Sequence, residues 1–218
     1  MARGAKGALA PRLGFWIVAV LAVLTAVASL RSLTFDPNVI ADALRQNLLD
    51  RPLPFWIHTI TGPLALLLGI FQFLPATRRN AYHRWSGRIY VAACLIGGVS
   101  AFIIAFTTSA GPVAAAGFVI LSLLWMGATV IAVTKAVQRD FRAHRAWMIR
   151  SYALTAAAIT LRLILAVGTV ADQPFMRVYI FSAWACWIIN LVIAEIIISR
   201  RPAPVGPLRP AEFAATRV

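Results

Sequence analysis

Long uncharged apolar stretches, separated by short basic segments, dominate the chain. A run of about 20 apolar residues is enough to cross a bilayer as a helix. The run from residue 89 to 134 is too long for one span, and Gly111-Pro112 divides it. The pattern therefore predicts an all-α integral membrane protein with six transmembrane helices, near residues 13–30, 52–77, 89–108, 112–134, 148–170 and 178–198.

Composition agrees with this prediction. Of the 218 residues, 61% are hydrophobic and only 13% are charged, whereas soluble domains carry about 25% charged residues. A soluble enzyme and a disordered chain are both excluded. The two cysteines, Cys94 and Cys186, lie inside apolar runs, so no disulfide framework is expected.

The net charge of +14 comes from basic residues at the ends of the predicted helices rather than from a basic domain. Nucleic-acid binding is therefore not expected. The N-tail, the second loop, the fourth loop and the C-tail are rich in Arg and Lys, whereas the intervening loops hold only Arg31, Arg45, Arg51 and Arg177. This alternation predicts that both termini are cytoplasmic.

The N-terminus also allows another interpretation. Arg3, Lys6 and Arg12, then an apolar run, then Ala26-Val27-Ala28 imitate a cleavable signal peptide. The apolar run is longer than the usual signal core of about 7–15 residues, which favours an uncleaved first helix. We expect one transmembrane domain over residues 1–200, a short amphipathic surface helix near 38–49, and a flexible proline-rich cytoplasmic tail over 201–218.

Two similar segments follow helices that run in the same direction. His83-Arg84-Trp85 precedes Arg88 and Tyr90, and His144-Arg145, with Trp147, precedes Arg150 and Tyr152. Gly62-Pro63 is expected to open the preceding helix of the first pair, and Gly111-Pro112 that of the second. Two hairpins in one orientation predict a parallel repeat, in which the second to fifth helices form a four-helix core flanked by the first and sixth.

These segments also resemble a known family. His58, Gly62, Gly69, Gln72-Phe73, the run from His83 to Tyr90 and the run from His144 to Thr155, ending in Leu161-Arg162, are similar to the bacterial membrane proteins grouped as domain of unknown function 2306. The resemblance covers about residues 52–165. It implies a multi-pass helical protein of the bacterial inner (plasma) membrane and implies no established activity.

Ionisable groups at membrane depth are costly and suggest function. Arg162 has no carboxylate at its depth, and His58 enters the membrane to a similar depth from the outer side. We predict an outer-half polar ligand site made by His58, Thr61 and Arg162, with Arg162 facing the bundle interior. The alternative is a structural arginine that caps helix carbonyls. Glu195 is expected to form an interfacial pair near Arg200 and Arg201, and Gln72 and Asn190 are expected to join helices by hydrogen bonds.

A second candidate site lies on the inner side and contains His83, Arg84, Arg88, His144, Arg145 and Arg150. It suits lipid phosphates or interfacial anchoring. It also allows one b-type haem, with His83 and His144 as iron ligands and arginines on the propionates. Both histidines precede their helices, which is unusual for such ligands. No other metal site has the required ligand spacing.

Three functions remain open from the residues. The first is non-catalytic binding of an amphipathic or anionic ligand, such as lipid or quinone. The second is a redox protein with one haem b. The third, a small transporter, fits the repeat but lacks a mid-membrane carboxylate. No nucleophile–base arrangement points to an enzyme.

Overall fold

The computed structural model describes residues 3–30, 33, 42–74 and 81–200, and these residues are almost entirely helical. The order of elements is α1 (Arg3–Leu30), α2 (Asp42–Asp50), α3 (Pro52–Gln72), α4 (Ala81–Ala105), α5 (Gly111–Val137), α6 (Phe141–Thr155), α7 (Ala157–Val170) and α8 (Phe175–Ser199). The described part contains no strand. The prediction of an all-α protein is confirmed.

Local sequence explains where several helices begin and end. Pro52 and Pro112 are in the first turns of α3 and α5, where a missing backbone N–H costs nothing. The expectation that Gly62-Pro63 opens a helix was wrong, because Pro63 lies inside α3. Asp140 precedes α6, and its carboxylate accepts a hydrogen bond from the Ala143 amide at 3.0 Å. Arg139, between α5 and α6, has a positive φ of 60°, which reverses the chain within a few residues.

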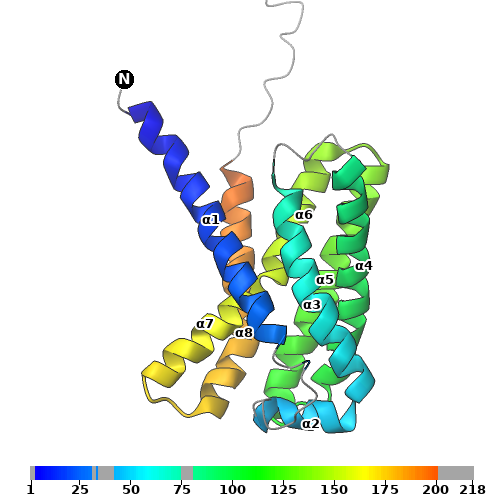
Figure 1. Cartoon of the computed structure of the whole chain (residues 1–218), viewed down its shortest axis with the longest axis vertical. Helices are drawn as coiled ribbons and strands as arrows, with labels where there is room; N and C mark the ends of the chain where they lie inside the picture. The colour runs from blue at the N-terminus through cyan, green and yellow to red at the C-terminus, as the bar shows by residue number, and fades with distance from the viewer. Residues whose placement is uncertain (1–2, 31–32, 34–41, 75–80, 201–218) are drawn as a thin grey trace, which may run out of the picture.

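Helices α3 to α6 form an antiparallel four-helix bundle (Figure 1). Its core includes Tyr90, Cys94, Trp125 and many alanines. Small residues let the helices approach closely, because a Cβ added at Gly69 or Gly97 would overlap a side chain of a neighbouring helix.

The span predicted over residues 148–170 differs from the structure in one respect. It is divided at Ala156, where α6 ends and α7 begins, and Ile159 donates to the Ala156 carbonyl with three-residue spacing at 2.9 Å. After the division, α7 leaves the bundle and pairs with α8 (Figure 1). The α1 helix crosses this region and packs on α3 and α7.

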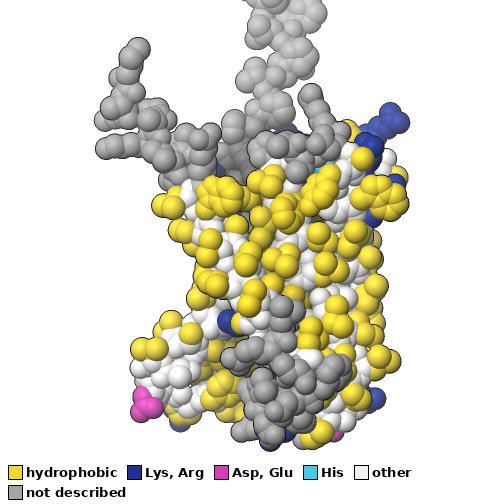
Figure 2. Space-filling model, in the orientation of Figure 1, with side chains coloured by type: hydrophobic (Ala, Val, Ile, Leu, Met, Phe, Trp, Pro, Cys, Tyr) yellow, Lys and Arg dark blue, Asp and Glu magenta, His cyan; other side chains and the backbone are white. Residues whose placement is uncertain are grey.

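Five helical segments of the described chain are long and apolar enough to cross a membrane, namely α3, α4, α5, the combined segment Phe141–Val170, and α8. The apolar part of α1, Leu13–Ser29, is shorter. The protein is therefore a multi-pass helical membrane protein. Hydrophobic side chains cover most of the face that Figure 2 shows between the two ends of the molecule.

We call one end of the molecule the basic end. It carries the start of α1, the end of α8 and the α5–α6 turn (Figure 1), and it includes Arg84, Arg88, Arg142 and Arg145. The opposite end carries α2 and the α7–α8 turn. The predicted surface helix at 38–49 corresponds to α2, and its residues 38–41 lie outside the described part. Three further sets of residues also lie outside the described part of the structure. They are Arg78 and Arg79, the predicted tail 201–218, and the side chains of Arg3, Lys6 and Arg12.

Candidate functional site

His58 and Thr61 lie one turn apart on α3 and both contact α4 at Gly97. The His58 Nδ1 is 3.1 Å from the Gly97 carbonyl oxygen. A Cβ at Gly97 would lie 2.6 Å from the Thr61 hydroxyl oxygen, so only glycine permits this contact. The Thr61 hydroxyl donates to the Ile57 carbonyl at 2.7 Å. Because a carbonyl only accepts, the neutral His58 ring carries its proton on Nδ1, and Nε2 is left as an acceptor.

Arg162 lies on α7, in the seam between α7 and α1. Its guanidinium donates from Nη2 to the Ser29 hydroxyl of α1 at 2.9 Å and from Nη1 to the Ala158 carbonyl at 2.9 Å. The residue is exposed on the surface of the protein. Among the described side chains, no carboxylate forms an ion pair with it. Two N–H groups of the guanidinium therefore donate to neutral oxygens. No described carboxylate neutralises its positive charge.

His58 and Arg162 lie on different helices, α3 and α7. With a rise of about 1.5 Å per residue, His58 lies about 9 Å from the start of α3, and Arg162 lies about 12 Å from the end of α7. Both ends belong to the opposite end of the molecule. The two residues thus occupy a similar depth.

The surroundings of Arg162 differ from the expectation of an interior position. Ser151 and Thr155, on the same predicted span as Arg162, precede the break at Ala156 and are buried in the four-helix bundle. There the Tyr90 hydroxyl lies 2.8 Å from Ser151 Oγ and 3.0 Å from Thr155 Oγ1. The break separates this polar cluster from Arg162, which contacts α1 instead.

The division at Ala156 is held by α8. The Asn190 side-chain amide donates to the Ala153 carbonyl at 3.0 Å, and its oxygen accepts from Thr160 at 2.8 Å. One side chain of α8 therefore contacts the last turn of α6 and the first turn of α7. Gln72 similarly joins α3 to α4 by donating to Ser86 at 2.8 Å.

Arg150, from the second His-Arg segment, is engaged within the protein. Its guanidinium donates to both oxygens of Glu195, from Nε at 2.6 Å and from Nη2 at 2.9 Å, and lies 4.6 Å from the centre of the Trp147 ring. Among the described residues the ion-pair partner of Glu195 is thus Arg150 of α6 rather than Arg200, which is nearer in sequence, and Arg201 lies outside the described part. His144 Nδ1 lies 2.7 Å from the Ala132 carbonyl of α5.

The first His-Arg segment opens α4 and has a similar internal contact. Arg88 lies 5.0 Å from the centre of the Trp85 ring, so the Trp and the Arg three residues later stack in both segments. Arg84, Trp85 and Arg88 are exposed, and His83 is half-buried. The carboxylate contact that Arg150 makes has no counterpart among the contacts described for Arg88.

Sequence reasoning did not identify Ser29 as a partner of Arg162. The signal in the sequence was a pair of hydroxyl residues, Thr25 and Ser29, one turn apart in the apolar part of α1. In the structure the Ser29 hydroxyl donates to the Thr25 carbonyl at 2.8 Å. Nor did it predict the contact of Trp125 Nε1 with Thr155 at 2.8 Å. Within the described part of the chain, no group of three or more His, Cys, Asp or Glu side chains has the arrangement of a metal site.

The fold and these sites define a multi-pass helical membrane protein with polar side chains at depth. A family model described as "Predicted membrane protein (DUF2306)" matches residues 55–198. The chain therefore belongs to this family, as the two His-Arg segments indicated. No curated protein matches the chain, and no solved structure matches it either.

Proposed function

We propose that the protein is a six-span protein of the bacterial inner membrane, with both termini cytoplasmic, that binds an amphipathic or anionic ligand without catalysing a reaction. The distribution of charge supports this orientation, since the described part of the basic end includes Arg84, Arg88, Lys135, Arg139, Arg142 and Arg145, whereas that of the opposite end includes Arg45, Arg51 and Arg177. In this orientation α1 is the first span, and the opposite end faces the periplasm. The two Trp-Arg stacks, at Trp85 and Trp147, support a parallel repeat of two hairpins.

The observation that carries the proposed function is the position of Arg162. An arginine at the centre of a transmembrane helix costs about 2.5–3.5 kcal/mol on the insertion scale. Arg162 is exposed and contacts only neutral oxygens among the hydrogen bonds described for it. An oxygen-rich ligand group within the membrane would complete the coordination of this guanidinium, because five N–H donors are available and two are used.

His58 limits the chemistry of the ligand. Its neutral ring presents Nε2 as an acceptor, whereas Arg162 presents donors. A ligand hydroxyl can donate to His58 Nε2, and a hydroxyl or carbonyl oxygen can accept from Arg162. A quinol or a protonated fatty acid can satisfy both residues, whereas the carbonyl of a quinone satisfies Arg162. A lipid phosphate is normally found at the membrane surface, about 9–12 Å from these residues. We therefore favour a quinone-like headgroup at this site over a phospholipid.

The test is a thermal-stability measurement on the purified full chain, with ubiquinone-2 or dioleoyl phosphatidylglycerol added. Ligand at 100 times its dissociation constant adds about 2.7 kcal/mol to the free energy of unfolding. We expect ubiquinone-2 to stabilise the wild type and to have no effect on Arg162→Leu, whose ligand-free stability changes little. Arg162→Lys should restore little of the effect, because lysine lacks the planar fork of donors.

The matched control is Arg177→Leu, which removes an exposed arginine of the opposite end and should keep the response to ubiquinone-2. A structural arginine gives a different result: Arg162→Leu then lowers stability equally with and without ligand. Wild-type protein whose stability responds to neither probe would contradict the proposed function.

A second candidate, one b-type haem held by His83 and His144, is favoured by one contact. His144 donates from Nδ1 to the Ala132 carbonyl, and such a second bond is typical of metal-bound histidines, because it leaves Nε2 free for the metal. The absorption spectrum of protein purified from haem-replete cells decides this candidate. A Soret band that His144→Ala abolishes would support it, and colourless protein would exclude it.

A further inference from the structure

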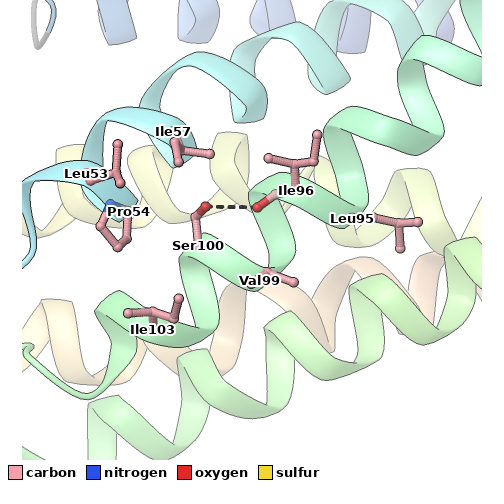
Figure 3. A pocket seen from close by; sticks show the side chains of 8 residues that line it. All are labelled: Leu53, Pro54, Ile57, Leu95, Ile96, Val99, Ser100 and Ile103. Carbon is pink, nitrogen blue, oxygen red and sulfur yellow. Dashed lines mark hydrogen bonds between the residues drawn. The ribbon is translucent and has the colours of Figure 1, made fainter.

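An apolar groove runs along the surface between α3 and α4, in the half of the protein nearer the opposite end. Figure 3 shows Leu53, Pro54 and Ile57 from α3, and Ile96, Val99 and Ile103 from α4, along its walls. Its volume is about 450 Å³. The Ser100 hydroxyl donates to the Ile96 carbonyl at 2.9 Å (Figure 3), so this side chain is satisfied within its own helix. The groove is therefore suited to hydrocarbon.

The length of the groove matches one leaflet. Its α4 wall extends from Leu95 to Ile103, which is about 12 Å of helix at a rise of about 1.5 Å per residue. Half of a hydrocarbon core of about 30 Å is about 15 Å. An acyl chain of one leaflet fills such a groove, whereas a transmembrane helix of a partner would need a groove along the whole span.

A cationic residue is next to the groove in the sequence. Arg51 immediately precedes α3 and is two residues from Leu53, the first residue of the α3 wall. The residue is exposed, and its side chain makes no capping hydrogen bond to α3. In the proposed orientation α3 begins at the membrane surface, where a bidentate contact between an arginine and a phosphate is favourable.

We propose that this groove binds an anionic phospholipid of the leaflet at the opposite end, with one acyl chain between α3 and α4 and the phosphate group on Arg51. In the proposed orientation this is the outer leaflet. The site shares no residue with His58, Thr61 and Arg162, and it does not depend on the function proposed for them. It adds to the protein a second ligand of a different class.

Native mass spectrometry of the full chain in a neutral detergent tests whether the protein prefers an anionic headgroup. The probes are dioleoyl phosphatidylglycerol and dioleoyl phosphatidylcholine, which have the same acyl chains. One arginine near a surface phosphate corresponds to about fivefold in affinity. We expect phosphatidylglycerol to be retained about fivefold more tightly, and Arg51→Gln to remove this preference. Arg177→Gln, an exposed arginine at the same end, should leave it unchanged.

A variant that fills the groove tests whether an acyl chain binds there. Val99 is half-exposed on the groove wall, so Val99→Phe occupies the groove without entering the core. The matched control is Val192→Phe, at a similarly exposed position on α8. We expect Val99→Phe to weaken the binding of both lipids and Val192→Phe to change neither. Equal retention of the two lipids by the wild type, or equal effects of Arg51→Gln and Arg177→Gln, would overturn the assignment, as would full retention by Val99→Phe.

Discussion

Arg150 and Glu195 form a two-pronged ion pair that joins α6 to α8 near the basic end, with N–O distances of 2.6 and 2.9 Å. The Trp147 ring lies on the other side of the guanidinium. The pair connects the second His-Arg segment to the last helix. It thereby joins the basic end of the four-helix bundle to α8, whose Asn190 also contacts Ala153 and Thr160 on the two sides of the break at Ala156.

A double-mutant cycle measures this coupling. Arg150→Gln, Glu195→Gln and the double variant should give a coupling free energy of about 0.5–1 kcal/mol in detergent unfolding, since the two side chains are 24% and 53% exposed. The coupling should fall at high salt, because screening weakens exposed pairs. Arg142→Gln is the control for removing an exposed charge of α6. Additive effects of the two single changes would show that the pair contributes nothing.

Gly69 of α3 is the point where the tyrosines of both His-Arg segments meet. A Cβ at this position would overlap the Tyr152 ring and would lie 3.1 Å from Tyr90 Cε2. We expect Gly69→Ala to lower the free energy of unfolding by about 1–3 kcal/mol, as overpacking does. Tyr152→Leu, which shortens the obstructing side chain, should recover part of the loss in the double variant.

Gly62, two turns earlier on the same helix, is the matched control. A Cβ there would meet nothing within 4 Å, so Gly62→Ala should be neutral or stabilise by up to about 1 kcal/mol. If both alanine variants have the same stability, the close approach at Gly69 does not constrain the bundle.

The Tyr90 hydroxyl contributes to the buried polar cluster of the bundle through Ser151 and Thr155. Tyr90→Phe removes these two contacts while keeping the ring, and hydrogen bonds between membrane helices are worth about 0.6–1.7 kcal/mol. We expect a loss of about 1 kcal/mol in unfolding experiments. Tyr82→Phe, at an exposed position of the same helix, should change stability by much less, and equal effects of the two variants would argue against the cluster.

The positions of the helices could be predicted because hydrophobic length and flanking charge determine them. Long apolar runs with few or no charges located the long helices, and prolines marked the starts of α3 and α5. The break at Ala156 could not be predicted, since it falls among alanines, which favour helix. A polar side chain of another helix, Asn190, contacts Ala153 before the break and Thr160 after it, and these contacts exist only after packing.

The prediction of the site residues was limited because contacts between helices exist only after packing. Depth along each helix is a property of the sequence, so His58 and Arg162 could be assigned similar depths. The partner of a charge is a property of packing. Glu195 pairs with Arg150, 45 positions earlier, and Arg162 contacts Ser29 in the first helix.

Arg139 in the α5–α6 turn adopts a backbone conformation that favours glycine. Its φ is 60°, while the amides of Arg139 and Asp140 donate to the Ala136 and Lys135 carbonyls at 3.0 Å, as at a helix end of the Schellman type. Arg139→Gly should therefore raise the free energy of unfolding by up to about 1 kcal/mol. Arg142→Gly, inside the first turn of α6, should lower it by about 0.5–1 kcal/mol. A loss of stability in Arg139→Gly would contradict the strain at this turn.

Asn190 offers a test of the division between α6 and α7. Its amide donates to Ala153 of α6, and its oxygen accepts from Thr160 of α7, so Asn190→Leu removes both contacts and leaves the Ala153 carbonyl without this donor. We expect a loss of about 1 kcal/mol in unfolding, although leucine is the more lipophilic residue. Asn190→Asp keeps the acceptor for Thr160 but cannot donate to Ala153 when ionised, and it should be at least as unstable. Ile189→Leu, at an exposed neighbouring position, is the neutral control. If Asn190→Leu proves as stable as wild type, hydrophobic packing alone holds the two half-helices against α8.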